Sequence, residues 1–122
     1  MHIPKDLVAA SATPLVLGIL TEGESYGYAI LKRVNELSGG ELQWTDGMLY
    51  PLLHRLERLG YAEAAWKVPA GSRARRRKYY RITEPGRRAL SEQRRQWAVI
   101  TGALGDLWHE MSPPPSPALQ GS

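Results

Sequence analysis

The stretch TDGMLYPLLHRLERLG at residues 45–60 decides the fold, because it suits one helix with two unlike faces. Four leucines have the i, i+3, i+4, i+7 spacing of a helix face that packs onto a core: Leu49, Leu52, Leu53 and Leu56. The other face mixes small, hydrogen-bonding and cationic residues: Gly47, Met48, Tyr50, Pro51, His54, Arg55 and Arg58. Because this is not a plain Glu/Lys surface, we expect the outer face to contact another molecule.

The ends of this helix are also marked in the sequence. Thr45 or Asp46 can accept backbone N–H bonds at its start, and Gly60 can end it in a left-handed conformation. Pro51 conflicts with a regular helix, because it removes a backbone donor and disfavours helical geometry at Tyr50. Local rules are most often broken where function sits, which again points to the outer face.

Length and composition favour one small domain with an uneven charge. The chain has 122 residues, of which 43% are apolar, enough for a single modest core. The 16 Lys and Arg residues exceed the 12 Asp and Glu residues, and the excess lies late in the chain. Residues 1–60 hold five basic and seven acidic side chains, whereas residues 67–88 hold nine basic side chains and one acidic. So concentrated a positive field favours a polyanionic partner.

Several kinds of protein and site are excluded by what the sequence lacks. There is no cysteine, which rules out disulfides, thiolate zinc sites and cysteine nucleophiles. His2, His54 and His109 are scattered, and neither a Gly-rich phosphate loop nor a nucleophile elbow occurs, so we expect neither an enzyme nor a cofactor. The sequence shows no leader and no apolar run of about 20 residues, so we expect a cytoplasmic protein without a membrane span.

The residues before this helix predict the first part of a helix-turn-helix. Residues 3–12 suit a short amphipathic helix, and Pro14 predicts either a kink in it or the start of a second short helix. Residues 15–20 are apolar almost all round and should be covered on more than one side. Ser25 is placed to cap a further helix that runs to Leu37. The residues expected on the inner side of that helix are Tyr26, Ile30, Val34 and Leu37.

A basic hairpin is predicted after the central helix. Residues 61–68 and 78–83 read as two strands, because aromatic and β-branched residues partly alternate in them. The connection between the strands carries a cluster of cations: Arg73, Arg75, Arg76, Arg77 and Lys78. A helix-turn-helix followed by a two-stranded basic wing is the winged-helix arrangement, in which a helix enters a DNA groove and the wing holds adjacent backbone. The expected fold class is therefore mainly α, an α+β winged helix.

A long helix is predicted over residues 84–111, with Thr83 as its cap and Pro85 in its first turn. At 1.5 Å per residue it would reach roughly 40 Å, too far for so small a core to cover. Large apolar residues follow a seam like one half of a coiled coil: Leu90, Trp97, Leu104, Leu107, Trp108 and Met111. We therefore expect two chains to pair along this helix as a homodimer.

These patterns divide the chain into three parts. Residues 1–83 form the winged helix-turn-helix domain with its N-terminal helix, and residues 84–111 form the dimerisation helix. Residues 112–122, SPPPSPALQGS, carry prolines that block a helix and little that could be buried, so we expect a disordered tail.

Three short motifs occur in order along the chain: GY at residues 27–28, LYPLLHRLE at residues 49–57 and YYRITEPG at residues 79–86. In these motifs the chain resembles the PadR family of bacterial transcriptional regulators, and the resemblance covers residues 15–90. The single C-terminal helix resembles the small subfamily. Within it, the IPK start and the tryptophan midway along the last helix are similar to the lactococcal multidrug-sensing regulator.

The resemblance implies a homodimeric repressor that binds a palindromic site on double-stranded DNA and is released by a small planar aromatic effector. In the multidrug-sensing relative, paired tryptophans in a pore between subunits hold the ligand, and Trp97 is the matching residue. The neighbouring wall would comprise Leu7, Ala10, Pro14, Gly18, Arg94, Ile100 and Thr101. Arg94 and Thr101 depart from the relative, which has an apolar aromatic and an acid there, so an anionic or neutral ligand is expected.

Alternative interpretations accompany these expectations. A winged-helix module can bind protein or RNA without sensing a ligand, and such a module would lack the twofold spacing that a dimer imposes on an operator. His54 suits either a base contact or an ordinary solvated helix surface, and Trp97 suits either a ligand platform or dimer packing. Trp66 and Trp108 are expected to be packing residues, while of Tyr79 and Tyr80 one should lie in the core.

Overall fold

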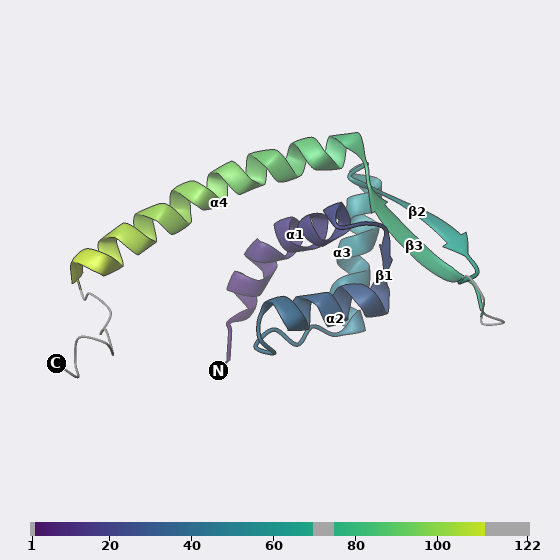
Figure 1. The fold of residues 1–122 in the computed structure, drawn as a ribbon, viewed down its shortest axis with the longest axis horizontal. Helices are drawn as coiled ribbons and strands as arrows, with labels where there is room; N and C mark the ends of the chain where they lie inside the picture. The colour runs from purple at the N-terminus through teal and green to yellow at the C-terminus, as the bar shows by residue number, and fades with distance from the viewer. Residues whose placement is uncertain (1, 70–74, 112–122) are drawn as a thin grey trace. The chain divides into compact units, whose positions relative to one another are not determined.

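The computed structural model describes residues 2–69 and 75–111, which form the elements of a winged helix. Along the chain these are α1, β1, α2, α3, β2, β3 and α4 (Figure 1). The chain divides into two compact units, Met1–Ser91 and Glu92–Ser122. The expected mainly helical winged-helix fold with a long last helix is confirmed.

Helix α1 (Lys5–Thr21) is one helix that contains Pro14, so the alternative of two short helices does not apply. Its second half supplies Val16, Leu17, Ile19 and Leu20 to the core, each at most 5% exposed. Because these positions point in several directions around the helix, the expectation that this segment is covered on more than one side is confirmed.

The start of α2 (Gly27–Leu37) differs from the expectation. Ser25 and Tyr26 form the short strand β1 (Ser25–Tyr26), so Ser25 does not cap the helix and Tyr26 does not belong to its inner face. No side chain caps α2, whose N-cap residue is Tyr26 in an extended conformation. The sequence did not predict β1, because a strand of two residues is too short to show an alternating pattern and its partner β3 lies far along the chain.

The end of α2 also contains one correction. Ile30 and Val34 are fully buried as expected, but Leu37 is 51% exposed. Leu37 is the last residue of the helix, and Gly39 and Gly40 turn the chain away there with φ angles of +61° and +87°. The glycine stop was expected, and its effect is that the last turn of α2 leaves the core.

Helix α3 (Asp46–Arg58) carries the predicted core leucines. Leu49, Leu53 and Leu56 are 0% exposed, whereas Leu52 is half-buried and packs at the edge of the core. Thr45 is the N-cap residue, but its side chain makes no hydrogen bond there, so the expected side-chain cap is not formed. Gly60 follows the helix with a φ of +77°, the left-handed conformation expected for it.

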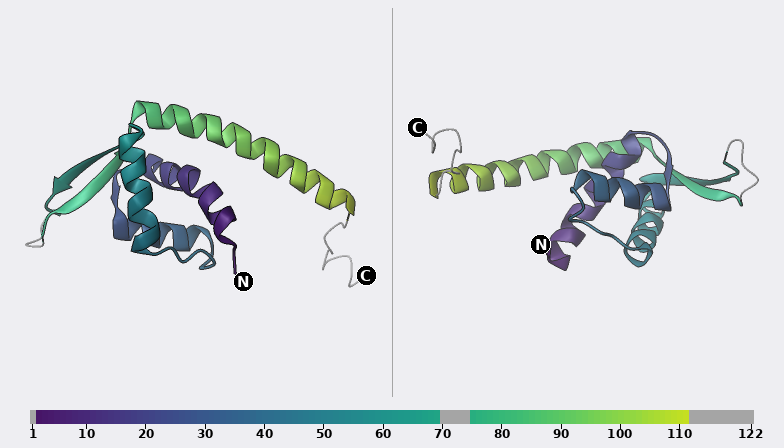
Figure 2. Two further views of the ribbon diagram at one scale, coloured as in Figure 1. Left: turned by 180° about the vertical axis from the view of Figure 1, so that it is seen from behind. Right: turned by 60° about the horizontal axis from the view of Figure 1, so that its bottom comes forward.

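A three-stranded antiparallel sheet completes the first unit in the order β1-β3-β2. The wing consists of β2 (Ala62–Lys67) and β3 (Arg77–Ile82), close to the predicted boundaries, and it extends away from helices α1 to α3 (Figure 2). Strand β1 adds to the other edge of β3, where Ser25 pairs with Tyr80. The wing is therefore tied at its base to the connection between α1 and α2.

The core of the first unit is apolar throughout, and no charged residue among those described is buried in it. Tyr80 is 1% exposed while Tyr79 is only half-buried, which confirms that one of the two lies in the core. The core residues come from all three helices, the sheet, the connection before α3 and the first turns of α4 (Glu84–Met111): Val16, Leu17, Ile19, Leu20, Ile30, Val34, Trp44, Leu49, Leu53, Leu56, Ala62, Tyr80, Ile82 and Leu90.

The junction between the wing and α4 depends on Thr83 and Gly86. The hydroxyl of Thr83 accepts a hydrogen bond from the backbone N–H of Gly86 at 3.1 Å, as expected of a cap, and donates one to the carbonyl oxygen of Gly60. A Cβ on Gly86 would overlap the backbone carbonyl of Tyr61, whose carbon would lie 2.9 Å away. Only glycine therefore allows α4 to begin this close to the end of α3.

Within residues 2–69 and 75–111, no helix has the length and apolar composition needed to cross a bilayer.

Candidate nucleic-acid interface

The outer face of α3 and the wing border a cleft of about 580 Å³, referred to below as the wing cleft. Tyr50 and His54 come from α3, and Arg76 and Arg77 come from the wing. The remaining lining comes from β1, the start of α2, β2 and β3: Tyr26, Gly27, Tyr28, Trp66, Lys78 and Tyr80. Among the described residues that line this cleft, three are cations and none is a carboxylate, which makes it electrostatically suited to a polyanion.

Tyr50 packs its hydroxyl group directly over the first residue of α2. An added Cβ on Gly27 would overlap that hydroxyl oxygen and would lie 2.9 Å from the ring carbon Cζ. Gly27 is buried, and its backbone does not require the left-handed region. Glycine is needed here for close approach, and Gly27 thereby sets the position of the Tyr50 hydroxyl in the wing cleft.

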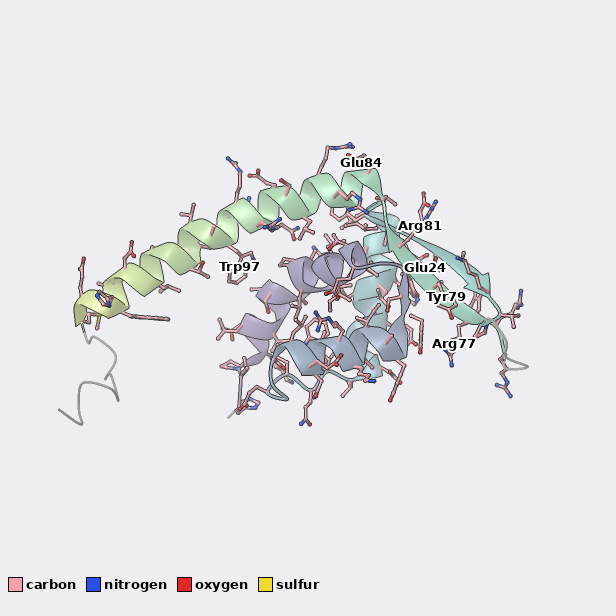
Figure 3. All side chains as sticks on the ribbon, viewed as in Figure 1. Glu24, Arg77, Tyr79, Arg81, Glu84 and Trp97 are labelled. Atoms are coloured by element: carbon pink, nitrogen blue, oxygen red, sulfur yellow. The ribbon has the colours of Figure 1, made fainter. Side chains whose placement is uncertain are left out.

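Cationic side chains stack on aromatic rings in and beside the wing, where Figure 3 labels Arg77 and Tyr79. The guanidinium carbon of Arg77 lies 4.4 Å from the ring centre of Tyr26, and that of Arg76 lies 5.9 Å from the ring centre of Trp66. Tyr26 in turn meets Tyr79 edge-on, with ring centres 5.5 Å apart. Cation–π contacts of this kind hold a guanidinium in place while its N–H groups remain available to an anion.

The expectation that Trp66 is a packing residue is wrong for the first unit, because its side chain is 59% exposed. It lies opposite Lys78 in the register of the wing, beyond the point where β2 and β3 cover the core. Its ring instead forms part of the wing cleft and carries the guanidinium of Arg76.

Lys78 has a different environment from the arginines beside it. Its Nζ lies 3.1 Å from Oε1 of Glu57 on α3, and both side chains are about 30% exposed or less. The contact with Glu57 raises the pKa of Lys78, while burial raises the pKa of the neighbouring Tyr80. Lys78 therefore links the wing to α3 through an ion pair, in addition to lining the wing cleft.

The sequence-predicted DNA-binding residues fall into separate groups. Tyr50, His54, Arg76, Arg77 and Lys78 meet in the wing cleft, and Arg75 is exposed beside it. Gly47 and Arg58 are exposed on α3. Arg73 lies outside the described residues. The others line a different cavity, together with α1 and the connection before α3: Met48, Pro51 and Arg55.

That second group follows from helix geometry. Positions 50 and 54 are four residues apart and share one side of α3, and positions 48, 51 and 55 share a neighbouring side turned toward α1. The sequence pattern distinguished an inner from an outer face of the helix, but the outer face is wide enough to border two hollows.

The predicted ligand residues lie on two helices. Leu7, Ala10, Pro14 and Gly18 lie on α1 in the first unit, and Leu7 is 56% exposed. The others lie on α4 in the second unit: Arg94, Trp97, Ile100 and Thr101. Within α4 the hydroxyl of Thr101 donates to the carbonyl oxygen of Trp97 at 2.7 Å, so it is occupied by its own helix.

The second unit exposes most of the predicted dimer seam. Leu104, Leu107, Trp108 and Met111 are 39–70% exposed. Leu90 is different, because it is only 9% exposed and belongs to the core of the first unit. It was predicted at the dimer seam because it fits the heptad spacing, but it lies in the first turns of α4, which belong to the first unit.

Some residues of the interface were not predicted. Tyr26, Tyr28 and Trp66 line the wing cleft, and only the GY motif at residues 27–28 gave a signal for them.

The geometry as a whole is a helix-turn-helix whose second helix shares a cation-lined cleft with a two-stranded wing. That arrangement defines the winged-helix class of DNA-binding proteins.

Comparison with known proteins identifies the family. The model of the transcriptional regulator PadR-like family matches residues 16–92, and the chain belongs to that family. The protein is accordingly a DNA-binding transcriptional regulator and not an enzyme.

Similar proteins support the same conclusion. A PadR family transcriptional regulator from Eggerthella lenta is 34% identical, with a TM-score of 0.70, and the match covers 84% of this chain and 85% of that one. A transcriptional regulator from Clostridium thermocellum is 26% identical, with a TM-score of 0.74, covering 84% of this chain and 97% of that one. Transcriptional regulator Rv3488 of Mycobacterium tuberculosis is 45% identical over 60 residues, 49% of this chain and 53% of that protein.

Proposed function

We propose that this regulator is a homodimeric repressor that binds a palindromic operator through two copies of the wing cleft and leaves it when a planar aromatic ligand binds. The observation that carries the proposal is the wing cleft itself, where Tyr50 and His54 of α3 lie beside Arg76 and Arg77 of the wing. Tyr50 and the arginines suit phosphate contacts, and His54 suits a base edge.

The apolar row on α4 supports the homodimer. Leu104, Leu107, Trp108 and Met111 leave a large apolar surface in contact with water, and such a surface marks a site of association. Their spacing suits a second helix with the same sequence, as in a coiled coil. A twofold pair of wing clefts then requires two half-sites about one helical turn apart, roughly 10 base pairs or a multiple of it.

The proposed effector site would use Trp97 of both subunits as flat surfaces for an aromatic ring. Arg94 and the neutral Thr101 on the same helix make an anionic or neutral ring system more suitable than a cationic one. Release from DNA would follow if the ligand binds better to a dimer whose two wing clefts are spaced wrongly for the operator.

Footprinting on the promoter of the protein's own gene tests the operator, and sedimentation of matched variants tests the dimer. Leu104→Asp should produce monomers with weakened operator binding, because it places a charge in the seam. Val99→Asp is the control, since Val99 is 72% exposed on the same helix but off the heptad positions. One asymmetric protected region, or a Leu104→Asp variant that sediments like wild type, would refute the dimeric proposal.

The effector is tested separately, by fluorescence titration with planar aromatic compounds in the presence and absence of operator. Wild type should show quenching and loss of DNA, and Trp97→Ala should bind these compounds at least tenfold more weakly, about 1.4 kcal/mol. Unchanged affinity in Trp97→Ala would remove Trp97 from the effector site without affecting the proposed operator binding.

A further inference from the structure

A second hollow lies within the first unit, on the side of α3 that turns away from the wing cleft. It measures about 960 Å³ and is bordered by the first half of α1, the connection before α3 and α3 itself. This hollow, the α1–α3 cavity, has the size of cavities that bind drug-sized molecules. Val8, Leu42 and Leu52 give it apolar walls, and all three also pack against the core. It shares none of its lining with the wing cleft or with the residues expected around Trp97.

Two cations border the α1–α3 cavity from opposite elements. Lys5 begins α1 and Arg55 lies on α3, and both are exposed. Neither side chain forms a hydrogen bond or an ion pair with another of the described residues. Glu41 also lines the cavity, so the lining carries two fixed positive charges and one negative charge, besides the imidazole of His2. An unpaired guanidinium next to apolar walls is the usual recognition element for a carboxylate.

Trp44 adds an aromatic wall to the α1–α3 cavity. Its side chain lines the α1–α3 cavity and is 9% exposed, and its indole Nε1 is buried without a hydrogen-bond partner in residues 2–69 and 75–111. A buried indole N–H usually has an acceptor. Because the Nε1 atom itself is shielded from solvent, the part of Trp44 that the cavity offers to a ligand is the indole ring, a flat apolar surface.

We propose that the α1–α3 cavity is a second ligand site that takes an amphipathic organic anion, a flat apolar body with a carboxylate. Arg55 pairs with the carboxylate, Lys5 adds to the positive field, and the indole ring of Trp44 packs against the flat apolar body of the ligand. Each subunit contains one complete site, in contrast to the effector site proposed around Trp97, which needs two subunits.

The α1–α3 cavity also has a route to the DNA-binding surface. Met48, Pro51 and Arg55 line the cavity, and Tyr50 and His54 on the same helix line the wing cleft. A ligand held between α1 and α3 therefore contacts the helix that carries the DNA contacts. If it shifts α3, its affinity and the affinity for operator change each other by the same factor.

Titration calorimetry with sodium 2-naphthoate tests the proposal on full-length protein that carries Trp97→Ala, because wild type would also bind this planar anion at the effector site proposed around Trp97. The expected result is one ligand per chain, because each subunit holds a whole site, whereas a site shared by two subunits gives one ligand per two chains. The naphthalene analogue 2-naphthylmethylamine has the same ring and a positive charge, and it should bind at least tenfold more weakly. Absence of heat with naphthoate up to millimolar concentration, or equal affinity for the amine, would overturn the proposal.

Matched variants assign the site. Arg55→Met should weaken naphthoate binding by about 10- to 100-fold, the effect of losing a hydrogen bond to a charged group. Arg58→Met is the control, because Arg58 is exposed on the same helix and lines neither hollow. Both variants are made in the Trp97→Ala protein. If the Trp97→Ala protein binds no naphthoate, or if Arg55→Met and Arg58→Met behave alike, naphthoate does not bind in the α1–α3 cavity.

Discussion

Replacing Gly27 by alanine should weaken DNA binding through Tyr50 while leaving the fold intact. The new Cβ would lie 2.9 Å from Cζ of Tyr50, whereas carbon atoms in contact prefer about 3.5–4.0 Å, so the ring must retreat by about 1 Å. The overlapping atoms are the far end of a side chain that is 39% exposed, and the wing cleft beside it is open. The ring can therefore swing outward, which removes its hydroxyl from its position over α2.

The size of the effect follows from the hydrogen bond that the displaced hydroxyl could no longer make to DNA. A hydrogen bond from a hydroxyl to a phosphate, an acceptor with full charge, contributes about 1.5–3 kcal/mol, or roughly 10- to 150-fold in affinity. The proposed dimer would carry two copies, so the operator affinity should fall by about 100-fold or more. The free energy of unfolding should change by less than about 1 kcal/mol, because alanine improves a helix position by about 0.5–1 kcal/mol and the overlap is relieved at the surface.

Fluorescence anisotropy with labelled operator, combined with thermal unfolding, measures both quantities. Gly18→Ala is the control, because an added Cβ at Gly18 would have nothing within 4 Å. In a double-mutant cycle, Gly27→Ala and Tyr50→Phe should not be additive, since both remove the same hydroxyl interaction. Unchanged operator affinity in Gly27→Ala, or full additivity with Tyr50→Phe, would refute this reasoning.

Three further predictions concern the wing and its junctions. Gly86→Ala should lower the thermal midpoint strongly, by an amount equivalent to about 1–3 kcal/mol or more, because its Cβ would meet the backbone carbonyl of Tyr61, which cannot swing away as a side chain does. Glu57→Gln should destabilise the fold at neutral pH, and this difference should vanish in denaturant titrations at high pH. The reason is that the ion pair raises the pKa of Lys78, so its stabilisation is complete below the ordinary value of 10.5 and is lost as the pH rises through the raised value. Replacing residues 75–77 together by alanine should weaken binding to operator and random duplex alike and reduce the salt dependence, by about 0.9 in log–log slope for each phosphate that the wing no longer neutralises; an unchanged slope in a salt titration would show that the wing makes no phosphate contact.

Periodic patterns account for most of what the sequence could reveal about the fold. The leucines of α3, the capping role of Thr83 and the extent of α4 were predicted correctly, because each is a local pattern that shows within a few residues. Strand β1 was missed, because its two residues become a strand only by pairing with β3. The exposure of Leu37 was missed as well, since helical spacing cannot show where a helix leaves the core.

The candidate site shows the same division between local and long-range information. Charge clustering indicated the wing arginines, and the unusual outer face of α3 indicated Tyr50 and His54. The sequence did not show that the outer face of α3 borders two hollows. His54 lines the wing cleft and Arg55 lines the α1–α3 cavity, although the two residues are adjacent in sequence. The Glu57–Lys78 ion pair could not be predicted from the sequence either, because it depends on how close α3 and β3 lie in the fold.

Strand β1 has a consequence for how the chain matures during synthesis. All three helices α1 to α3 are synthesised before β3, so Ser25 and Tyr26 wait without their pairing partners, Tyr80 and Tyr79. Only the arrival of β3 supplies those partners together with the arginine that stacks on Tyr26. A nascent chain therefore completes the wing cleft only once β3 has been made, and any product of premature termination before that strand lacks this cleft.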